Sequence, residues 1–240
     1  ASTDITCTTT TATVTVTATA GVGPLQYETI APSPIIVAKQ TSNIFSGLTE
    51  GTYIFRVTDA NGCYYTESFT IDPVTPIAVT GLKLSDVLCN GGTTGAIQFT
   101  VYDATGFTYT INSGTSTTGT SPINLSGLTA GSYTIVVTDT TTGCTANETI
   151  TIEEPNTALS VSATATNVHC NNFESQITVT ASGGTPNYTY AAVVTGAAPP
   201  MALDYNSSNV ITVDTNSASD LVWDVYVKDT NGCIAMNSVT

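Results

Sequence analysis

The sequence is poor in positive charge and in long apolar runs, and each shortage excludes a class of partner. Its 240 residues hold four lysines and arginines against 18 aspartates and glutamates, a formal net charge of −14. Without a basic stripe, we expect no binding of nucleic acid or of anionic membrane surfaces. No apolar run reaches about 18 residues, so we expect no membrane insertion.

Catalytic and metal-binding patterns are missing too. The one histidine, His169, lies beside a cysteine, and neither G-x-S-x-G nor H-E-x-x-H occurs. Calcium loops need several closely spaced oxygen ligands, as in D-x-D-x-D-G, and the chain has no such run. We therefore predict that the protein is not an enzyme and needs no cofactor. The one metal site that we weigh is a calcium ion between modules, held by Asp72, Glu153 and Glu154.

Helical periodicity is scarce, and alternation with a period of two residues takes its place. Residues 11–19, 96–102 and 176–181 alternate apolar with hydroxyl-bearing side chains, which suits a half-buried strand. Glycine, proline, asparagine and serine clusters separate these runs, as in antiparallel β-sandwiches of the immunoglobulin-like type. In the first 75 residues we predict a short first strand and then strands near 12–20, 25–31, 35–39, 43–48, 52–59 and 64–71.

Six cysteines divide the chain into repeats. Cys63, Cys144 and Cys233 each close a similar phrase: VTDANGC, VTDTTTGC or VKDTNGC. Cys7, Cys89 and Cys170 recur with nearly the same period, and a period of this size indicates tandem modules. We predict three all-β modules in an elongated array, at residues 1–75, 76–157 and 158–240. We expect the last strand of the third module to be cut at Thr240.

An even set of widely spaced cysteines favours disulfides over zinc and an oxidising, extracellular compartment over the cytosol. We predict pairing within modules, because it leaves no cysteine over. The predicted pairs are Cys7–Cys63, Cys89–Cys144 and Cys170–Cys233. The alternative, Cys63–Cys89 with Cys144–Cys170, stays open, because in a simple immunoglobulin layout the early and late cysteines of one module would lie at opposite poles.

Two further repeated features have structural explanations. Asp59, Asp139 and Asp229 open the cysteine-closed phrases, and an aspartate there can accept backbone N–H groups of its own turn. In the first two modules G-L-T-x-G-x-Y leads into the preceding strand. We expect its tyrosines, Tyr53 and Tyr133, to be core aromatics, and Trp223 to replace them in the third module.

The motifs in this order resemble the SprB repeat. They are Cys89-Asn-Gly-Gly-Thr-Thr-Gly-Ala-Ile97, Gly183-Gly-Thr-Pro-Asn-Tyr-Thr-Tyr190, G-L-T-x-G-x-Y and V-T-D-x-N-G-C. The resemblance extends over essentially the whole chain and implies a PKD-like sandwich. It also implies type IX export and display as surface filaments of very large adhesins that serve adhesion and gliding in Bacteroidota. Cys7-Thr-Thr-Thr departs from C-N-G-G, and the third module lacks the G-L-T turn.

Three hypotheses about function follow. The first is a structural stalk of a secreted cell-surface adhesin, in which adjacent repeats of the same polypeptide are the partners. The second is a glycan-binding module that contacts surface polysaccharide through the insert at 196–208 and through Tyr64 and Tyr65. The third is self-assembly into a filament by edge pairing or by donation of a terminal strand.

Overall fold

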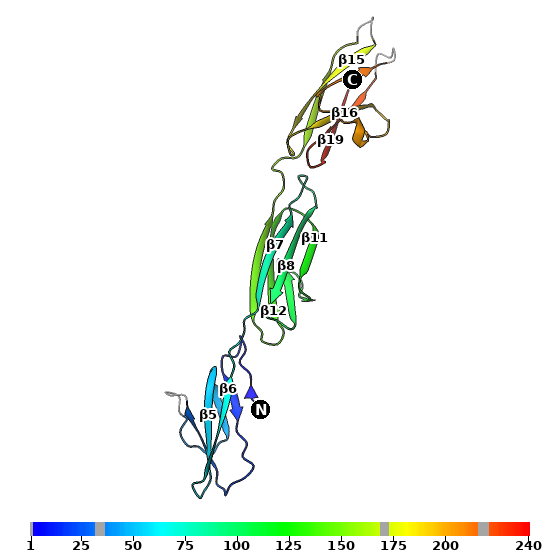
Figure 1. Cartoon of the computed structure of the whole chain (residues 1–240). Coiled ribbons are helices and arrows are strands. Elements are labelled where there is room, and N and C mark those ends of the chain that lie inside the picture. Colours follow the sequence, from blue (N-terminus) through cyan, green and yellow to red (C-terminus); the bar gives the residue numbers. More distant parts are fainter. Residues whose placement is uncertain (1, 32–36, 169–172, 216–220) are drawn as a thin grey trace. The chain divides into compact units, whose positions relative to one another are not determined.

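A computed structural model describes residues 2–31, 37–168, 173–215 and 221–240, and nearly all of its regular structure is β (Figure 1). Within those ranges the only helix is the short 3₁₀ turn η1 (Ala202–Asp204). This helix is too short to cross a membrane. The strands are β1 (Ser2–Thr3), β2 (Ala12–Thr15), β3 (Gln26–Ala31), β4 (Ile44–Leu48), β5 (Gly51–Thr58), β6 (Tyr64–Ile71), β7 (Ala78–Ser85), β8 (Gly95–Tyr102), β9 (Phe107–Ile111), β10 (Thr117–Gly119), β11 (Ile123–Leu128), β12 (Gly131–Asp139), β13 (Thr145–Ile152), β14 (Ser160–Ala165), β15 (Glu174–Ser182), β16 (Thr189–Val194), β17 (Val210–Asp214), β18 (Trp223–Lys228) and β19 (Ile234–Val239). The predicted all-β fold is confirmed.

Each of three consecutive stretches of the chain supplies two sheets. Residues 2–71 form the sheets β1-β2-β4 and β3-β5-β6, and residues 160–239 form β14-β15-β17 and β16-β18-β19. Residues 78–152 form β11-β8-β7 and β10-β9-β12-β13. By backbone contacts the chain divides into two compact units: residues 1–80 with 99–123 and 134–148, and residues 81–98 with 124–133 and 149–240. The module boundaries at 75/76 and 157/158 stay predictions.

In the first unit an aromatic cluster forms the core of residues 2–71. The Phe45 and Phe55 rings meet edge to face with centroids 4.8 Å apart, and Tyr53 packs beside Phe55. Ala12 and Val14 of β2 point into the same cluster. At its margin the buried Glu28 accepts a 2.7 Å bond from Arg56, so the one buried carboxylate of this core is paired.

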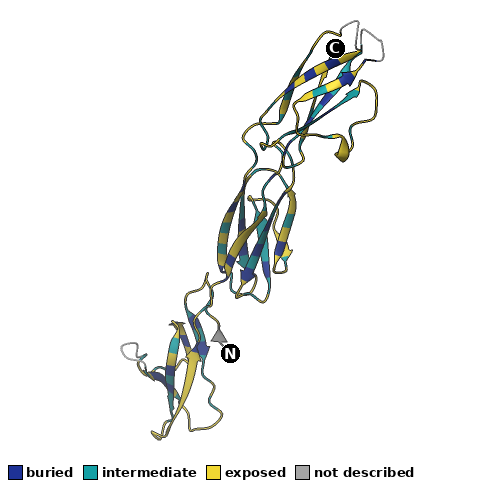
Figure 2. Ribbon diagram, turned by 45° about the horizontal axis from the view of Figure 1, so that its top comes forward, coloured by how far each residue is buried: buried dark blue, intermediate teal, exposed yellow. Residues whose placement is uncertain are grey.

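In the second unit β-branched residues form the core of residues 160–239. Ile177 and Val179 of β15 face Val225 and Val227 of β18, and all four are fully buried. Along β15 exposed residues alternate with buried or half-buried ones without interruption, and several strands in Figure 2 are banded in the same way. This alternation is the sequence pattern of residues 176–181 expressed as a sheet with one buried face.

Two strand boundaries differ from the sequence prediction. Strand β2 ends at Thr15 rather than near residue 20, at the point where its pairing with β4 ends, Thr15 beside Ile44. The strand predicted at 35–39 falls partly outside the described residues, and 37–39 form no strand. In the third stretch β19 pairs with β18 from Ile234 beside Lys228 to Val239 beside Trp223, and the expectation that the last strand is cut at Thr240 stays a prediction.

Candidate functional site: the aspartate turns and the cross-linking cysteines

Three hairpin turns with one hydrogen-bond pattern carry the late cysteines. They are Asp59–Cys63 between β5 and β6, Asp139–Cys144 between β12 and β13, and Asp229–Cys233 between β18 and β19. In each turn the aspartate N–H donates to the cysteine carbonyl at 2.9–3.0 Å. The glycine N–H donates back to the aspartate carbonyl at 2.9–3.1 Å. Each glycine has a positive φ, which lets the chain close the turn without steric strain.

The aspartate side chains accept backbone N–H groups of these turns. Oδ1 of Asp229 accepts the Cys233 N–H at 2.8 Å, and its Oδ2 accepts the Thr185 N–H at 2.8 Å. Asp229 is 4% exposed, so a buried carboxylate is satisfied entirely by backbone donors. Asp59 repeats the pattern with the Cys63 N–H at 2.9 Å and the Val22 N–H at 3.3 Å.

Asp139 also accepts backbone N–H groups of its own turn, which is one residue longer. Its Oδ1 accepts the N–H groups of Thr141 and Thr142 at 2.6 and 3.1 Å. In all three turns the residue after the aspartate donates its N–H to the loop that precedes the third strand of that stretch. These donor and acceptor pairs are Ala60 to Val22, Thr140 to Gly106 and Thr230 to Thr185. The turns therefore have fixed backbone geometry and hold their cysteines at the same place.

The disulfides join different stretches of the chain. Cys7 is bonded to Cys144, and Cys89 is bonded to Cys233, with Cα–Cα distances of 4.9 and 5.7 Å. Cys63 is free and exposed. The predicted pairs Cys7–Cys63 and Cys89–Cys144 are therefore wrong, and so are the alternatives Cys63–Cys89 and Cys144–Cys170. Cys170 lies outside the described residues, but the predicted Cys170–Cys233 is excluded because Cys233 is bonded to Cys89.

The length of a strand explains why pairing within a module fails. Cys7 precedes β2, whereas the Asp59–Cys63 turn contacts Val22, which follows the continuation of β2. Strand β2 and the chain that continues it to residue 18 span roughly 23 Å when extended. A disulfide requires Cα atoms within about 7 Å of each other. Cys7 is therefore out of reach of its own turn and bonds to the turn of the next stretch.

Hydrogen bonds surround each cross-link. The Cys7 N–H donates to the Thr142 carbonyl at 3.0 Å. At the second cross-link the Asn231 amide donates to the Leu88 carbonyl at 2.9 Å, beside the Cys89–Cys233 bond. The Asn90 amide donates to the Pro155 carbonyl at 2.8 Å. The loops of Cys7 and Cys89 are thus held by polar contacts as well as by a covalent bond.

Two of the acids considered for calcium, Glu153 and Glu154, have other partners in the structure. The Glu154 carboxylate accepts the Gly91 N–H at 2.6 Å, and the Glu153 carboxylate lies 3.9 Å from Lys83 Nζ. The Glu153 N–H also donates to Asp86 Oδ1 at 2.8 Å. The bond from the Glu153 backbone, with Lys83 at 2.9 Å, lowers the pKa of Asp86. In the part of the chain that the structure describes, no three histidine, cysteine, aspartate or glutamate side chains converge on one point.

The three aromatic residues singled out from the sequence differ in burial. Tyr53 is 1% exposed, and its hydroxyl donates to the Thr49 carbonyl at 3.1 Å. Tyr133 makes the same bond to Thr129 at 3.0 Å but is only half-buried. Trp223 is half-buried and packs against the core of residues 160–239. The G-L-T-x-G-x-Y motif thus forms the same tyrosine-to-threonine hydrogen bond in two stretches, with a buried tyrosine in one and a half-buried tyrosine in the other.

The residues considered for glycan binding are exposed. Tyr64 and Tyr65 on β6 are 68% and 70% exposed. The insert at 196–208 carries η1, where Leu203 is 97% exposed. Lys228 lies over the ring of Tyr205 at 4.4 Å. The two tyrosines belong to the first unit and the insert to the second.

Sequence reasoning missed the polar residues around the cross-links. Asp86, three residues before Cys89, binds the Glu153 N–H, and Asn231 binds the loop that carries Cys89. Their signal in the sequence is modest: an aspartate three residues before each of Cys7 and Cys89, and an asparagine two residues before Cys63 and Cys233. Their partners could not be found without knowing which stretches of the chain the disulfides join.

Comparison with known proteins gives one sequence match and several weak structural ones. Residues 162–191 match the SprB repeat. No curated protein matches the sequence. The human desmocollin-1 ectodomain is similar at a TM-score of 0.30 and 11% identity, over 90% of this chain and 50% of that one. The BSP domain of a biofilm-associated protein gives a TM-score of 0.29 and 12% identity, over 80% of this chain and 42% of that one. An eight-domain immunoglobulin fragment of the Down syndrome cell adhesion molecule gives a TM-score of 0.35 and 10% identity, over 96% of this chain and 33% of that one.

The chain spans about half the length of these solved chains or less. The SprB match begins within β14 and ends within β16, so it covers β15 and the Gly183–Tyr190 motif. Over residues 162–191 this all-β chain is similar to the SprB repeat.

Proposed function

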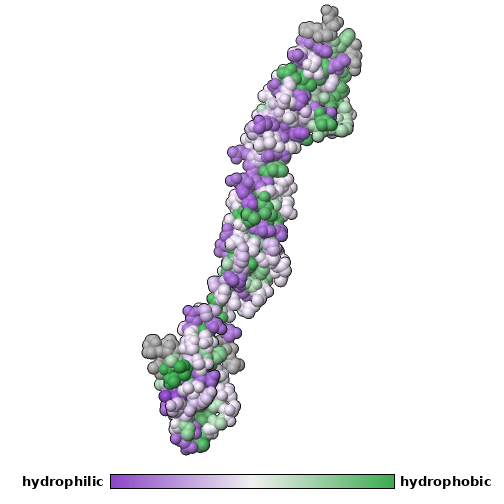
Figure 3. Space-filling model, in the orientation of Figure 1, coloured by the Kyte–Doolittle hydropathy of each residue, from purple (hydrophilic) through white to green (hydrophobic). Residues whose placement is uncertain are grey.

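We propose that the chain forms non-catalytic structural repeats of a secreted cell-surface adhesin. The observation that carries the proposal is the SprB match at residues 162–191, in a chain whose turn motif occurs three times. Residues of intermediate hydropathy cover much of the visible surface, and hydrophobic residues lie there in small groups (Figure 3). Type IX export, display on long filaments and a role in gliding are finer parts of the same proposal. The partners are adjacent repeats of the polypeptide.

The mechanism that we propose is resistance to extension. A force that pulls on the two ends of the chain passes through both disulfides. The shortest covalent path runs from residue 1 to Cys7, crosses to Cys144, returns to Cys89, crosses to Cys233 and ends at residue 240. That path contains about 70 residues, which reach about 250 Å when fully extended, against about 830 Å for the whole chain. Unfolding therefore releases little length while the cross-links are intact.

Single-molecule stretching measures this effect. The oxidised chain should yield roughly a third of the contour length of the reduced chain. Cys63→Ser is the matched control, because Cys63 is outside both cross-links, and it should behave as the unaltered chain does. Equal contour lengths before and after reduction would contradict the mechanism.

A cellular experiment tests the adhesin assignment itself. Antibodies raised against the chain should label intact cells of its source, and deletion of the coding region should reduce attachment to a solid surface. Catalytic activity is not part of the expected phenotype. Labelling only after the cells are broken open would overturn the assignment.

Exposed side chains favour one alternative, a glycan-binding module. Tyr64, Tyr65 and Leu203 are large and exposed, and binding residues are often found on such loops and edges. A glycan array probed with the chain and with a Tyr64→Ser, Tyr65→Ser variant separates the two functions. Binding that the variant loses favours the module, and the absence of binding favours the structural repeat.

A further inference from the structure

Three asparagines of the chain stand directly before a glycine: Asn61, Asn90 and Asn231. Glycine has no Cβ, so the peptide nitrogen that follows the asparagine is open to approach. In such a pair this nitrogen can attack Cγ of the asparagine side chain, and ammonia leaves. A hydrogen bond that holds the side-chain amide, or the N–H of the glycine, slows the attack. The three pairs differ in these bonds.

The side-chain amide of Asn231 is held from two sides. Its Nδ2 donates to the Leu88 carbonyl and to Thr185 Oγ1, each at 2.9 Å. The N–H of the glycine that follows donates to the carbonyl of the aspartate that opens the turn, at 3.1 Å. Both groups that would react are therefore engaged. The bond to Leu88 lies beside the disulfide between Cys89 and Cys233, and it depends on the two stretches staying together.

The side-chain amide of Asn90 is held by the linker that follows β13. Its Nδ2 donates to the Pro155 carbonyl at 2.8 Å, and the N–H of the next residue donates to the Glu154 carboxylate at 2.6 Å. Further hydrogen bonds join residues 86–87 to Glu153. None of these bonds involves the turn that carries Cys233, so the contacts of Asn90 do not need the cross-link.

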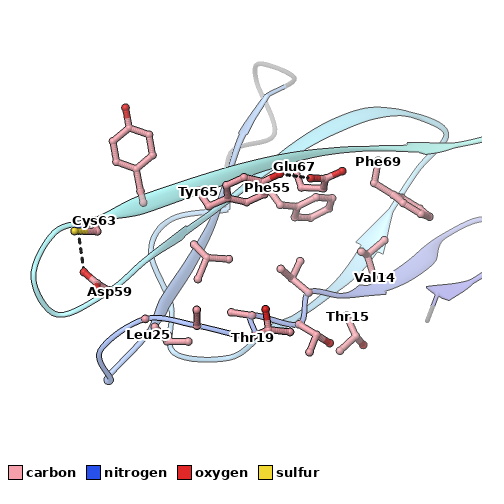
Figure 4. Close-up of a pocket in the computed structure, with 17 residues that line it drawn as sticks. Val14, Thr15, Thr19, Leu25, Phe55, Asp59, Cys63, Tyr65, Glu67 and Phe69 are labelled. Atoms are coloured by element: carbon pink, nitrogen blue, oxygen red, sulfur yellow. Dashed lines mark hydrogen bonds between the residues drawn. The ribbon is translucent and has the colours of Figure 1, made fainter.

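The turn between β5 and β6 has the same Asn-Gly pair without a cross-link. Figure 4 shows this turn, in which Asp59 accepts the Cys63 N–H at 2.9 Å. Asn61 is exposed, and within the described residues its side-chain amide has no hydrogen bond. Because Cys63 is free in this chain, Asn61 provides an internal reference for the reactivity of an uncross-linked turn.

We propose that the Cys89–Cys233 disulfide protects Asn231 from deamidation, and that Asn231 deamidates in chains whose disulfide is open. A thiol opens the disulfide by exchange, which leaves two cysteine thiols and oxidises the reductant to its own disulfide. The Leu88 carbonyl is then no longer held beside the turn. The amide of Asn231 keeps only its bond to Thr185, and its Cγ becomes accessible.

The reaction itself needs only water. The Gly232 nitrogen bonds to Cγ of Asn231 while the bond from Cγ to Nδ2 breaks, and the proton of the Gly232 nitrogen leaves with the ammonia. Water then opens the five-membered succinimide. Cleavage between Cγ and the Gly232 nitrogen gives aspartate, and cleavage at the backbone carbonyl carbon gives isoaspartate.

The product cannot restore the original contact. A carboxylate has no N–H to donate, and in place of the amide it would face the carbonyl oxygen of Leu88. A deamidated turn therefore binds the Cys89 loop more weakly, and its disulfide re-forms more slowly. Deamidation records that the cross-link has been open. This inference goes beyond the adhesin proposal, because it concerns the covalent state of the chain whatever the protein adheres to.

Peptide mass spectrometry after incubation of the full chain in mildly alkaline buffer tests the protection. In the unaltered chain Asn61 should deamidate fastest, and Asn90 and Asn231 slowly. In a Cys89→Ser, Cys233→Ser variant the rate at Asn231 should rise about fivefold, the factor that corresponds to the loss of one hydrogen bond. The rates at Asn61 and Asn90 should not change.

Asn90 separates release of one turn from general unfolding, since unfolding would expose both asparagines. A Cys7→Ser, Cys144→Ser variant is the matched control, and it should leave the rate at Asn231 as it is in the unaltered chain. An unchanged rate at Asn231 without its disulfide overturns the proposal. An equal rise at Asn90 and Asn231 also overturns it.

An Asn231→Asp variant tests the consequence of deamidation. After reduction and removal of the thiol, peptide mapping should show the Cys89–Cys233 disulfide re-forming several-fold more slowly than in the unaltered chain. Asn61→Asp makes the same change in the same local sequence and should leave this rate unaltered. Equal rates in the two variants would show that the amide and the disulfide do not depend on each other.

Discussion

At the scale of single residues, the aspartate turns contain the most sensitive buried charges of the chain. Each carboxylate replaces water with backbone N–H donors, so its removal leaves those donors without a partner. The cost of a buried donor left unsatisfied is about 1–3 kcal/mol. The three turns differ in burial, and the sequence alone could not rank them.

Asp229→Asn should loosen the third turn. The amide retains one acceptor oxygen but turns an N–H₂ group toward either the Cys233 N–H or the Thr185 N–H, which both need an acceptor. We expect a loss of about 2 kcal/mol, measured as faster amide exchange at Thr185. Asp59→Asn is the comparison. It should cost less, because Asp59 is more exposed and its second bond is longer, at 3.3 Å. An equal loss in both variants would contradict the role of burial.

Asp86 should make the contact between the Cys89 loop and Glu153 depend on pH. The Glu153 N–H and then Lys83 lower the pKa of Asp86 in the folded chain. A carboxyl whose pKa is lowered by folding stabilises the folded state above its unfolded pKa, near 3.9, and loses this effect as pH falls through the folded pKa. The amide resonance of Glu153 should shift with a midpoint below the ordinary aspartate pKa. Asp86→Asn should remove that transition, and a midpoint at or above 3.9 would contradict the assignment.

At the scale of elements, the tyrosine of G-L-T-x-G-x-Y fixes the turn between two strands. In the first stretch this turn joins β4 to β5, and glycines with positive φ, Gly47 and Gly51, lie at its ends. The Tyr53 ring is buried while its hydroxyl returns to Thr49. The motif therefore combines core packing with a local hydrogen bond.

Tyr53→Phe should cost about 1 kcal/mol, because only the hydroxyl bond is lost. Tyr53→Ala should cost about 3–5 kcal/mol, because a cavity is left in the core. Urea unfolding followed by amide exchange along β5 measures both. The same changes at the half-buried Tyr133 should cost less, and the reverse order would show that burial does not set the effect.

Strand alternation was the reliable sequence signal at this scale. Residues 176–181 predicted one buried face, and β15 has it. Residues 12–20 predicted a strand equally well, yet β2 ends at Thr15. A strand needs a hydrogen-bonded neighbour as well as a favourable pattern, and the neighbour of residues 16–20 is not encoded by those residues.

At the scale of the whole molecule, the cross-links decide how stretches of chain depend on one another. Sequence separations of 137 and 144 residues make each disulfide a long-range constraint. By the chain-entropy account, each restricts the unfolded chain by up to about 5 kcal/mol. Loss of either disulfide should therefore lower the free energy of unfolding of residues beyond its own turn.

Peptide mapping without reduction should recover Cys7 linked to Cys144 and Cys89 linked to Cys233, with Cys63 alkylated. Cys144→Ser should lower the free energy of unfolding by several kcal/mol and expose Cys7 to alkylation. Cys63→Ser is the matched control and should change neither. A peptide that links Cys7 to Cys63 would restore the pairing within modules.

The sequence by itself determined the all-β class, the repeated turns and the likeness to the SprB repeat, because alternation, glycine positions and cysteine-closed phrases are local patterns that each repeat carries. It also indicated the aspartate turns, since Oδ1 of each aspartate accepts N–H groups within its own turn. The tertiary structure decided which cysteines bond and which tyrosine is buried. Those outcomes depend on distances across whole strands, and a spacing of about 55 residues between two cysteines says nothing of whether a sandwich brings their Cα atoms within bonding reach.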